Sequence, residues 1–545
     1  MRFLEKMCFV VLASGLALGQ ASTPSNGAAG STSVADELKA LREAITEQQK
    51  QIAQQQQQIQ TLQNNLDAKT AGTPHVTEAS LTTSTSPSAA APTVQSDVEK
   101  AKESPLSFRI GAAEFTPGGF VDFENVFRST NLGSGISTSY GALPYNNTVQ
   151  GHLTEFRTTG QYSRLSLKTH AKFGVNDVTG YVEMDFNGND GANVFVTTNP
   201  HTDRLRLYWL DLKRGKWEFL GGQSWGWMTP NRVGIGPMPS DLALTIGEDA
   251  NVHVGVTHSR AGQFRAVWHP NDKFAWGIGI ENPDQFVNAG EVIYPFQFNA
   301  ALGAQLDTGN NNPPQTPNAA PDVVSKMGYD TTFGGGRHFH VEAGAMMRTF
   351  RITNVPIGGT TFAHHTSIGG AGEFAMNVDI FPKLKFLTNG FYSNGGARYA
   401  IGLGPDVVVA PIAQGAGKFD IDITKVHTSA GTIGFEAQAT PRTLLGFYYG
   451  GEYFQRNAFP DVTSPLVIKP IIGFGGINSP NSANRAIQQG SAEWTQTMWK
   501  NPQYGAVLLV TQYSYLTRAP WFVAAGAPKN AHLSQAYLSI RYVLP

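Results

Sequence analysis

Over most of its length the chain alternates apolar and polar residues with a period of two. In the stretch 164–170, Leu165 and Leu167 alternate with polar residues that include Arg164 and Lys168. The same pattern recurs at 181–187, 204–209 and 535–542. Because successive side chains of a β-strand point to opposite faces, each stretch is predicted to form a strand with one apolar and one polar face.

Sixteen strands of this kind are predicted, and two kinds of connection join them. The strands are 118–129, 159–174, 177–188, 203–213, 216–224, 253–268, 274–281, 323–333, 338–351, 366–379, 384–394, 428–438, 443–454, 491–500, 503–516 and 532–543. The short connections begin near 174, 213, 269, 334, 379, 439 and 501, and the long ones are 130–158, 189–202, 225–252, 282–322, 352–365, 395–427, 455–490 and 517–531. Short turns at one rim and long loops at the other are typical of an up-and-down outer-membrane barrel, whereas a soluble sandwich shares only the alternation.

The predicted fold class is therefore an all-β transmembrane barrel of about sixteen antiparallel strands, with both chain ends on the periplasmic side. The barrel has to close, because each unpaired backbone group in hydrocarbon costs several kcal/mol. The strand 253–268 is read as continuous, with a bulge at Gly262, because a break there would spoil the even strand count. Aromatic residues near strand ends form either interfacial girdles or ordinary core contacts; they are Trp209, Trp217, Trp276, Tyr448, Tyr449, Trp499, Tyr504 and Tyr542.

Residues 1–21 are typical of a cleaved secretory signal peptide. Arg2 and Lys6 precede an apolar run, and small residues around Gly19 and Ala21 suit a signal peptidase. The run is too short for a transmembrane helix, which needs about twenty apolar residues. The single cysteine, Cys8, lies inside this segment, so we expect neither disulfides nor thiol chemistry in the mature chain.

A heptad pattern in residues 33–67 predicts an α-helical coiled coil. The seam residues are Leu38, Leu41, Ile45, Ile52, Ile59, Leu62 and Leu66. Isoleucine at one seam position and glutamine in the other disfavour a dimer, so a trimer is predicted. The alternative is a disordered glutamine tract with apolar residues at chance positions. Residues 68–105, rich in Ala, Ser, Thr and Pro, are predicted to be a flexible linker to a barrel domain at 106–545.

Composition and motifs argue against several classes of function. The net charge is −1 and 15% of the residues are charged, which argues against nucleic acid as a partner because phosphate neutralisation needs a basic surface. The sequence has no HExxH or P-loop motif, and we predict no enzyme activity, no catalytic residue and no cofactor. His338 with His340 and His364 with His365 are read as ordinary polar residues, so no metal site is predicted.

The polar faces of the strands are predicted to line a water-filled bore, because Arg or Lys facing lipid at mid-depth costs about 2–4 kcal/mol. In 204–209 this assignment turns Leu207 and Trp209 outward and Arg206 and Tyr208 inward. The candidate pore-lining residues are Arg164, Lys168, Glu183, Asp185, Arg204, Arg206, Arg265 and Arg541. Two interpretations remain open: a row of cations that guides anions, or cross-strand pairing with the acidic residues that only keeps the bore wet.

Several stretches resemble successive strands of DcaP-like outer-membrane porins. They are RLRLYWLDL from 204, EFLGGQSWGW from 218, SRAGQFRAVW from 259, GIENPD from 279 and PDVVSKMGYD from 321. The likeness in layout covers most of residues 105–545, and the specific motifs lie between 204 and 330. The resemblance implies a homotrimer of sixteen-stranded barrels with a periplasmic helical extension, which passes small and often anionic organic solutes. Two departures are Gly226 after Trp225, and the C-terminal RYVLP in place of an aromatic end.

The resemblance also gives an expectation for the third long connection, residues 226–251, because the third loop of sixteen-stranded porins commonly folds into the bore and narrows it. The candidate constriction residues are Arg232, Asp241, Glu248 and Asp249. The alternative is a loop that points outward from the barrel. In the inward arrangement, acidic loop residues facing an arginine row would produce a transverse field that selects charged or dipolar solutes.

The leading hypothesis is an outer-membrane porin that forms a channel for small hydrophilic solutes, with a preference for anionic carboxylates. Its expected partners are membrane lipid, two further copies of the chain in a homotrimer, and small-molecule solutes. The coiled coil would then lie in the periplasm. The alternative hypothesis is a structural anchor, in which the coiled coil tethers the barrel to peptidoglycan or to a periplasmic partner.

Overall fold

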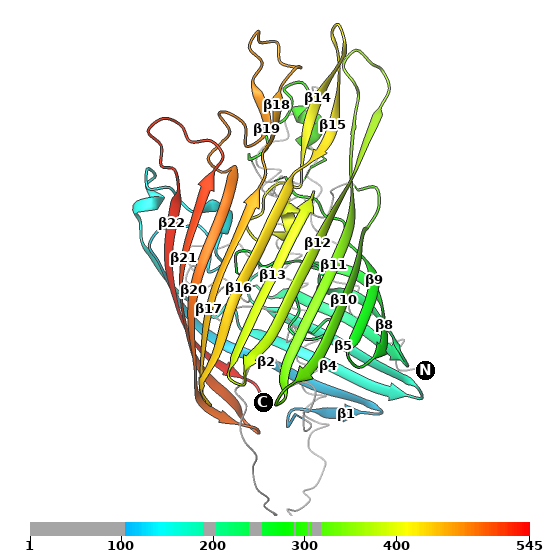
Figure 1. The fold of residues 1–545 in the computed structure, drawn as a ribbon, viewed down its shortest axis with the longest axis vertical. Coiled ribbons are helices and arrows are strands. Elements are labelled where there is room, and N and C mark those ends of the chain that lie inside the picture. The colour runs from blue at the N-terminus through cyan, green and yellow to red at the C-terminus, as the bar shows by residue number, and fades with distance from the viewer. Residues whose placement is uncertain (1–103, 189–201, 239–252, 288–289, 304, 307–317) are drawn as a thin grey trace, which may run out of the picture. The chain divides into compact units, whose positions relative to one another are not determined.

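The described part of the chain forms a closed barrel of sixteen antiparallel strands (Figure 1). The structure, a computed structural model, describes residues 104–188, 202–238, 253–287, 290–303, 305–306 and 318–545. The predicted signal peptide 1–21, the coiled coil 33–67 and the linker 68–105, apart from its last two residues, lie outside the described residues.

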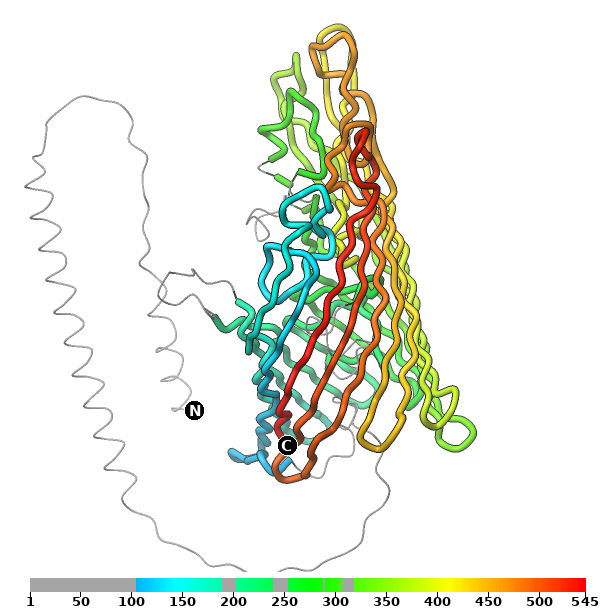
Figure 2. Tube along the Cα trace, turned by 90° about the vertical axis from the view of Figure 1, so that its left-hand side faces the viewer, coloured from blue at the N-terminus to red at the C-terminus, as the bar shows by residue number. Residues whose placement is uncertain are grey.

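The barrel strands follow one another around the wall in chain order. The first eight are β2 (Ala113–Arg128), β4 (Arg164–Phe173), β5 (Asn176–Asp185), β6 (Arg204–Arg214), β7 (Trp217–Trp225), β8 (Arg260–Asn271), β9 (Phe274–Glu281) and β10 (Asp322–Phe333). The other eight are β11 (Arg337–Asn354), β12 (Ala363–Phe381), β13 (Leu384–Asn394), β16 (His427–Thr440), β17 (Thr443–Phe454), β20 (Asn484–Asn501), β21 (Gly505–Pro520) and β22 (Ala531–Val543). The last strand pairs with the first, Val543 opposite Phe120, which closes the barrel (Figure 2).

Further short elements accompany the sixteen strands. They are β1 (Phe108–Ile110), β3 (Glu155–Thr159), β14 (Val407–Gly415), β15 (Lys418–Lys425), β18 (Asn457–Pro460), β19 (Ile471–Phe474), α2 (Asn299–Gly303), η1 (Tyr140–Ala142), η2 (Gln150–His152) and η5 (Ala397–Tyr399). The hairpins β14–β15 and β18–β19 extend beyond the barrel at the end that carries the long connections, at the top of Figure 1. None of the helices in the described ranges has the length and apolar character needed to cross a membrane.

Most predicted strands agree with the observed ones to within a few residues. The predicted strands 274–281, 384–394 and 443–454 have the bounds of β9, β13 and β17. The prediction of one strand at 159–174 is wrong, because residues 160–163 form a turn in which Ser163 N–H donates to Gly160 O. The segments on either side, β3 and β4, both pair with β2 and together occupy one strand position in the wall.

The predicted strand 253–268 is also corrected by the structure. Strand β8 begins at Arg260, and residues 253–259 belong to the preceding connection. His258 N–H donates to Tyr399 O at 2.9 Å, a contact outside the wall that competes with strand pairing. The strand is continuous through Gly262, which pairs in register with Gln223, so no bulge lies there.

A β-bulge in β6 reverses the predicted faces of three residues. Arg206 is the extra residue, since the pairing of β6 with β5 passes over it. Beyond it Leu207 and Trp209 are buried, and the ring of Trp209 stacks on that of Tyr181 with centroids 5.3 Å apart. Tyr208 is exposed instead. The predicted orientations of these residues are wrong because strict alternation fails where a strand carries one extra residue.

The exterior of the barrel is apolar. Large apolar side chains point outward on successive strands, among them Leu165, Leu210, Phe264, Ile278, Ile368, Phe447 and Ile540. Of the predicted girdle aromatics, Trp217, Trp276, Tyr449, Trp499, Tyr504 and Tyr542 are exposed. The girdle prediction is wrong for Trp209 and for Tyr448, which is buried and donates from its hydroxyl to Glu436 Oε1 at 2.9 Å. A closed barrel with such an exterior suits a bilayer, where no strand edge can be left unpaired.

Two levels of aromatic residues bracket the apolar exterior. Trp499 lies near the short turns, and toward the long connections Tyr449 and Tyr515 both lie opposite Gly490 of β20. Nine residues separate Gly490 from Trp499 on that strand. At about 3.3 Å per residue and a strand tilt of about 40°, the two levels are about 23 Å apart, close to the apolar band of about 25 Å in outer-membrane barrels.

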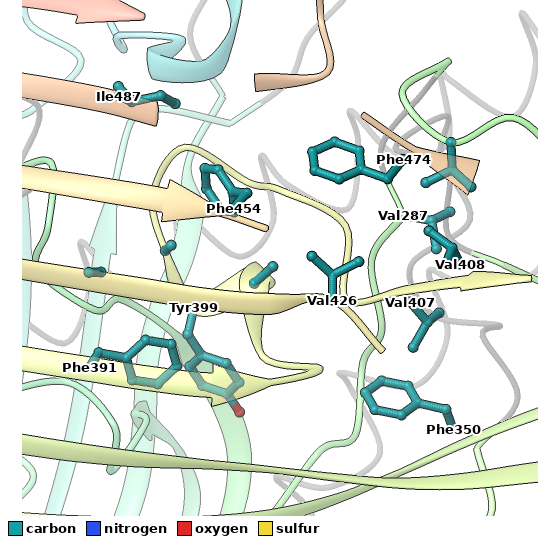
Figure 3. Packing of buried hydrophobic residues seen from close by; sticks show 14 of the residues in the cluster. Val287, Phe350, Phe391, Tyr399, Val407, Val408, Val426, Phe454, Phe474 and Ile487 are labelled. Carbon is teal, nitrogen blue, oxygen red and sulfur yellow. The ribbon is translucent and has the colours of Figure 1, made fainter. Parts of the chain in front are cut away.

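At the rim that carries the long connections, which we call the outer rim, these connections and the strand ends pack into one hydrophobic cluster. Phe350 of β11 contributes to it together with Tyr399 and Val407, which come from the connection after β13 (Figure 3). The fully buried Arg348 forms an ion pair with Asp406 of the same connection, Nη1 to Oδ2 at 3.2 Å. The long connections therefore form a packed structure at this end of the barrel.

Candidate channel constriction

The third long connection lies inside the barrel where the structure describes it, at 226–238 and 253–259. Trp227, Met228 and Thr229 are at most 2% exposed. Backbone N–H groups of the connection donate to carboxylates on inner strand faces: Trp227 to Glu281 Oε1 at 2.7 Å, Asn231 to Glu342 Oε1 at 2.8 Å, Gly234 to Asp330 Oδ2 at 3.0 Å and Gly255 to Glu452 Oε1 at 3.1 Å. These acceptors are spread over β9, β10, β11 and β17, so the connection crosses the interior rather than pointing outward.

Of the four predicted constriction residues, Arg232 is described and Asp241, Glu248 and Asp249 lie outside the described residues. Arg232 forms a bidentate pair with Glu436 of β16, Nη1 to Oε2 at 2.8 Å and Nη2 to Oε1 at 2.6 Å. Burial disfavours the charged guanidinium, but the nearby carboxylate outweighs that effect and raises the pKa of Arg232. Arg232 thus holds the connection against the wall.

Lys326 of β10 reinforces this attachment, and sequence reasoning did not single it out. Its Nζ lies 2.9 Å from Glu342 Oε1 and 3.2 Å from Glu373 Oε1, and it donates to Thr229 O and to Asn231 Oδ1, each at 3.0 Å. Its place on the polar face of a predicted strand was the available signal. The partners were not predictable, because two of them belong to the connection.

Four of the predicted pore-lining residues form one network on the opposite part of the wall. Arg206 pairs with Glu183 and with Asp185, each at 2.7 Å, and Arg204 pairs with Asp185 at 2.7 Å. Arg206, Glu183 and Asp185 are buried, and the side chain of Arg204 is 34% exposed. The cations and carboxylates of these strands therefore pair with one another across β5 and β6.

Three more predicted residues lie on neighbouring strands. Arg541 of β22 pairs with Asp122 of β2, Nη2 to Oδ2 at 2.6 Å. The guanidiniums of Arg541 and Arg164 lie over the ring of Phe120, 4.3 Å and 5.4 Å from its centroid. Lys168 is half-buried further along β4. Guanidinium groups thus follow one another from β22 through β4 to β6.

Arg265 and Arg260 of β8 extend this series, and neither forms an ion pair with any residue in the described ranges. Arg265 donates to Gln263 Oε1 and Trp225 O and lies 4.9 Å from the ring centroid of Trp227. Arg260, which sequence reasoning did not single out, lies 5.7 Å from the ring centroid of Trp225. Arg260 is the first residue of β8, and the sequence there does not alternate regularly, so its orientation could not be predicted.

The electrostatic environment of His258, which precedes β8, is positive. The ring of His258 meets that of Trp225 edge-on, with centroids 4.8 Å apart. Burial, followed by the charges of Arg260, Arg206 and Arg204, lowers the pKa of His258 to about 3. We call this part of the interior, on β4 to β8 and β22, the basic side.

One stretch on β7 matches the GxSxG spacing of hydrolase nucleophiles, GQSWG at 222–226. Ser224 is fully buried, and its hydroxyl donates to Pro237 O at 3.2 Å. A nucleophile elbow places its serine exposed at a strand-to-helix turn, whereas this one lies within a strand of the wall. Ser224 therefore lacks the geometry of a nucleophile elbow.

No protein-family model matches the sequence, and no curated protein matches it either. Solved structures do resemble it. The outer membrane channel DcaP of Acinetobacter baumannii superposes with a TM-score of 0.54 and 15% identity over 81% of this chain and 100% of that chain. The anion-selective porin of Comamonas acidovorans superposes with a TM-score of 0.42 and 12% identity, over 79% of this chain and 100% of that chain. OprB of Pseudomonas putida superposes with a TM-score of 0.42 and 11% identity, over 78% of this chain and 94% of that chain. At these identities the likeness concerns the fold, which is that of an outer-membrane channel.

Proposed function

We propose that the protein is an outer-membrane porin, a water-filled channel for small hydrophilic solutes that prefers anions, carboxylates in particular. The observation that supports this most directly is the path of the third long connection. It crosses the interior and attaches to Glu281, Glu342 and Glu452 of the wall. A connection held in this way narrows the bore against the basic side.

The charge distribution supports the preference for anions. On the wall behind the connection, Arg232 and Lys326 each pair with a carboxylate and compensate its charge locally, and other carboxylates accept backbone N–H bonds. On the basic side, Arg260 and Arg265 form no ion pair within the described ranges, although the charge of Glu281 acts on Arg265 and that of Asp185 on Arg260. A guanidinium offers a planar pair of donors that matches a carboxylate, and fixed charges lining a pore set its ionic selectivity.

The proposal extends to the assembly. We infer a homotrimer in the outer membrane, with residues 1–21 removed, residues 33–67 as a periplasmic coiled coil and residues 68–105 as its linker. The heptad seam supports the trimer. The exposed apolar side chains of the barrel support membrane lipid as its surroundings.

The test is reconstitution in planar bilayers under a salt gradient. We expect stepwise openings in groups of three and a reversal potential that indicates anion preference. Replacing Arg260 and Arg265 by Gln should lower the anion-to-cation permeability ratio severalfold, because two positive charges that form no ion pair in the described ranges are removed from the basic side. The control is Lys273→Gln, an exposed cation in the β8–β9 turn, which should leave the ratio unchanged.

Silence at all voltages would contradict the channel itself. An unchanged permeability ratio in the double variant, with normal conductance, would contradict the anion preference alone.

A further inference from the structure

Two arginines outside the bore flank one tryptophan at the outer end of the barrel. Arg456 follows β17, Arg485 lies at the start of β20, and Trp521 follows β21. The guanidinium carbons lie 5.8 Å and 6.0 Å from the ring centroid of Trp521. Both arginines are exposed. We call these three residues the outer arginine pair and its tryptophan.

The group faces away from the bore. Tyr453 of β17 is exposed on the barrel exterior, and its ring meets that of Trp521 edge-on with centroids 5.9 Å apart. The inward neighbours on the same strand, Glu452 and Phe454, are buried. The group therefore adjoins the lipid-facing surface and takes no part in the constriction.

Its height places it just beyond the apolar band. Tyr453 of β17 pairs with Ala486 of β20, and Tyr449, at the level where the apolar band ends, pairs with Gly490. Tyr453 therefore lies four residues closer than Tyr449 to the rim that carries the long connections. Four residues of tilted strand correspond to about 10 Å along the membrane normal. Headgroups occupy this zone, since a bilayer of about 40–45 Å contains a hydrocarbon core of about 30 Å.

The tryptophan is held in place by the backbone around it. Its Nε1 donates to Phe454 O at 2.9 Å, and its backbone N–H donates to Ala483 O at 3.0 Å. Gly475, with φ of +72°, lies against the ring, and a Cβ there would approach Trp521 Cδ1 to 2.5 Å. The ends of three strands and the β19 end of a hairpin thus hold the Trp521 ring in a fixed position between the two guanidiniums.

Neither arginine is neutralised by a residue that the structure describes. No carboxylate lies within 4.0 Å of either guanidinium in the described ranges, whereas Arg204, Arg206, Arg232, Arg348 and Arg541 all form ion pairs. Two uncompensated guanidiniums, spaced by an aromatic ring, can share the oxygens of one phosphate or contact two phosphates of one headgroup.

We propose that the outer arginine pair and its tryptophan bind the phosphate groups of an anionic glycolipid headgroup in the outer leaflet. A soluble anion could meet the same charges, but the position beside exposed Tyr453 and above the apolar band favours a ligand whose chains lie in the bilayer. The inference rests on the proposed outer-membrane location, and it is independent of solute selectivity.

The test uses the full-length protein in detergent, titrated with a bisphosphorylated glycolipid and followed by native mass spectrometry. Replacing both Arg456 and Arg485 by Gln should weaken binding at least about tenfold, since the variant removes the charge-assisted hydrogen bonds to the phosphate oxygens. The matched control is Arg442→Gln, an exposed arginine in the short turn between β16 and β17 at the opposite rim, which should bind as the wild type does.

Two further probes separate the sources of phosphate. The dephosphorylated glycolipid should bind wild type and double variant equally weakly, and inorganic phosphate should bind far more weakly than the glycolipid. Equal binding of the bisphosphorylated glycolipid by wild type and double variant would overturn the proposal. Inorganic phosphate binding as tightly as the glycolipid would overturn its assignment to lipid. Because these arginines lie outside the bore, single-channel conductance of the double variant should stay normal, which separates this test from that of the channel.

Discussion

Arg206 lies between two buried carboxylates, and its position depends on the bulge in β6. As the extra residue of that bulge, it reaches both Glu183 and Asp185 at 2.7 Å. Regular pairing would have put Leu207 on the exterior and left fewer contacts for the guanidinium. The alternation of the sequence predicted the wrong orientation for the residues after Arg206, because it cannot register an extra residue in the strand.

Replacing Arg206 by Met tests this network. We expect the free energy of unfolding, measured by urea titration in lipid vesicles, to fall by about 3–5 kcal/mol, because the variant leaves buried carboxylates without their main counter-charge. The control Lys216→Met changes an exposed cation in the β6–β7 turn and should have little effect. Equal stability of the Arg206 variant would contradict the pairing.

His258 gives a prediction for pH dependence. Its pKa in the folded protein is about 3, below its ordinary value of 6.5, so the unfolded chain takes up a proton first as the pH falls. The stability that neutral His258 contributes is present above pH 6.5 and is lost progressively as the pH falls toward 3. His258→Asn should therefore show a shallower loss of stability in this range than the wild type.

The measurement for His258 is the free energy of unfolding at a series of pH values. The control is His152→Asn, which changes an exposed histidine in η2. Parallel curves for wild type and His258→Asn would show that the depressed pKa is wrong.

At the scale of elements, the described parts of the third long connection, 226–238 and 253–259, are held mostly by their backbone. Four of their N–H groups donate to carboxylates of the wall, and the side chain of Arg232 adds the bidentate pair with Glu436. The acceptors come from strands on much of the circumference, so loss of one pair should loosen the connection without unfolding the barrel.

Glu436→Ala should therefore widen the constriction. Breaking a buried pair costs about 3–5 kcal/mol, and the freed Arg232 would draw its part of the connection toward water. We expect a larger single-channel conductance and more current noise. The control Glu114→Gln alters the pair of this half-buried carboxylate with the exposed Arg109, and it should leave both quantities unchanged. Unaltered conductance in Glu436→Ala would mean that this connection does not set the bore.

At the scale of the whole molecule, the barrel is a complete ring in which every strand has two neighbours, because β2 pairs with β22. Such a ring needs no other part of the chain to satisfy its backbone. The predicted coiled coil at 33–67 is therefore expected to act on assembly rather than on the fold of a single barrel.

Deleting residues 22–100, with the signal peptide retained, tests that expectation. We expect normal conductance per barrel and a lower thermal stability of the trimer on semi-native gels, because the seam would no longer contribute to association. Lost conductance would contradict independent barrels. A trimer of unchanged stability combined with a weakened cell envelope would favour the structural-anchor hypothesis instead.

The sequence by itself determined the sixteen strands, their order and the rims with short and long connections. This follows because strand alternation is a local pattern, and because a chain in hydrocarbon must pair every backbone group. Only the tertiary structure decided which charges meet. Arg232 and Glu436 are 204 residues apart and Gly255 and Glu452 are 197 apart, and a period-two pattern carries no information about such partners. The same holds for the interruption at 160–163 and the bulge at Arg206, since contacts with neighbouring segments override alternation there.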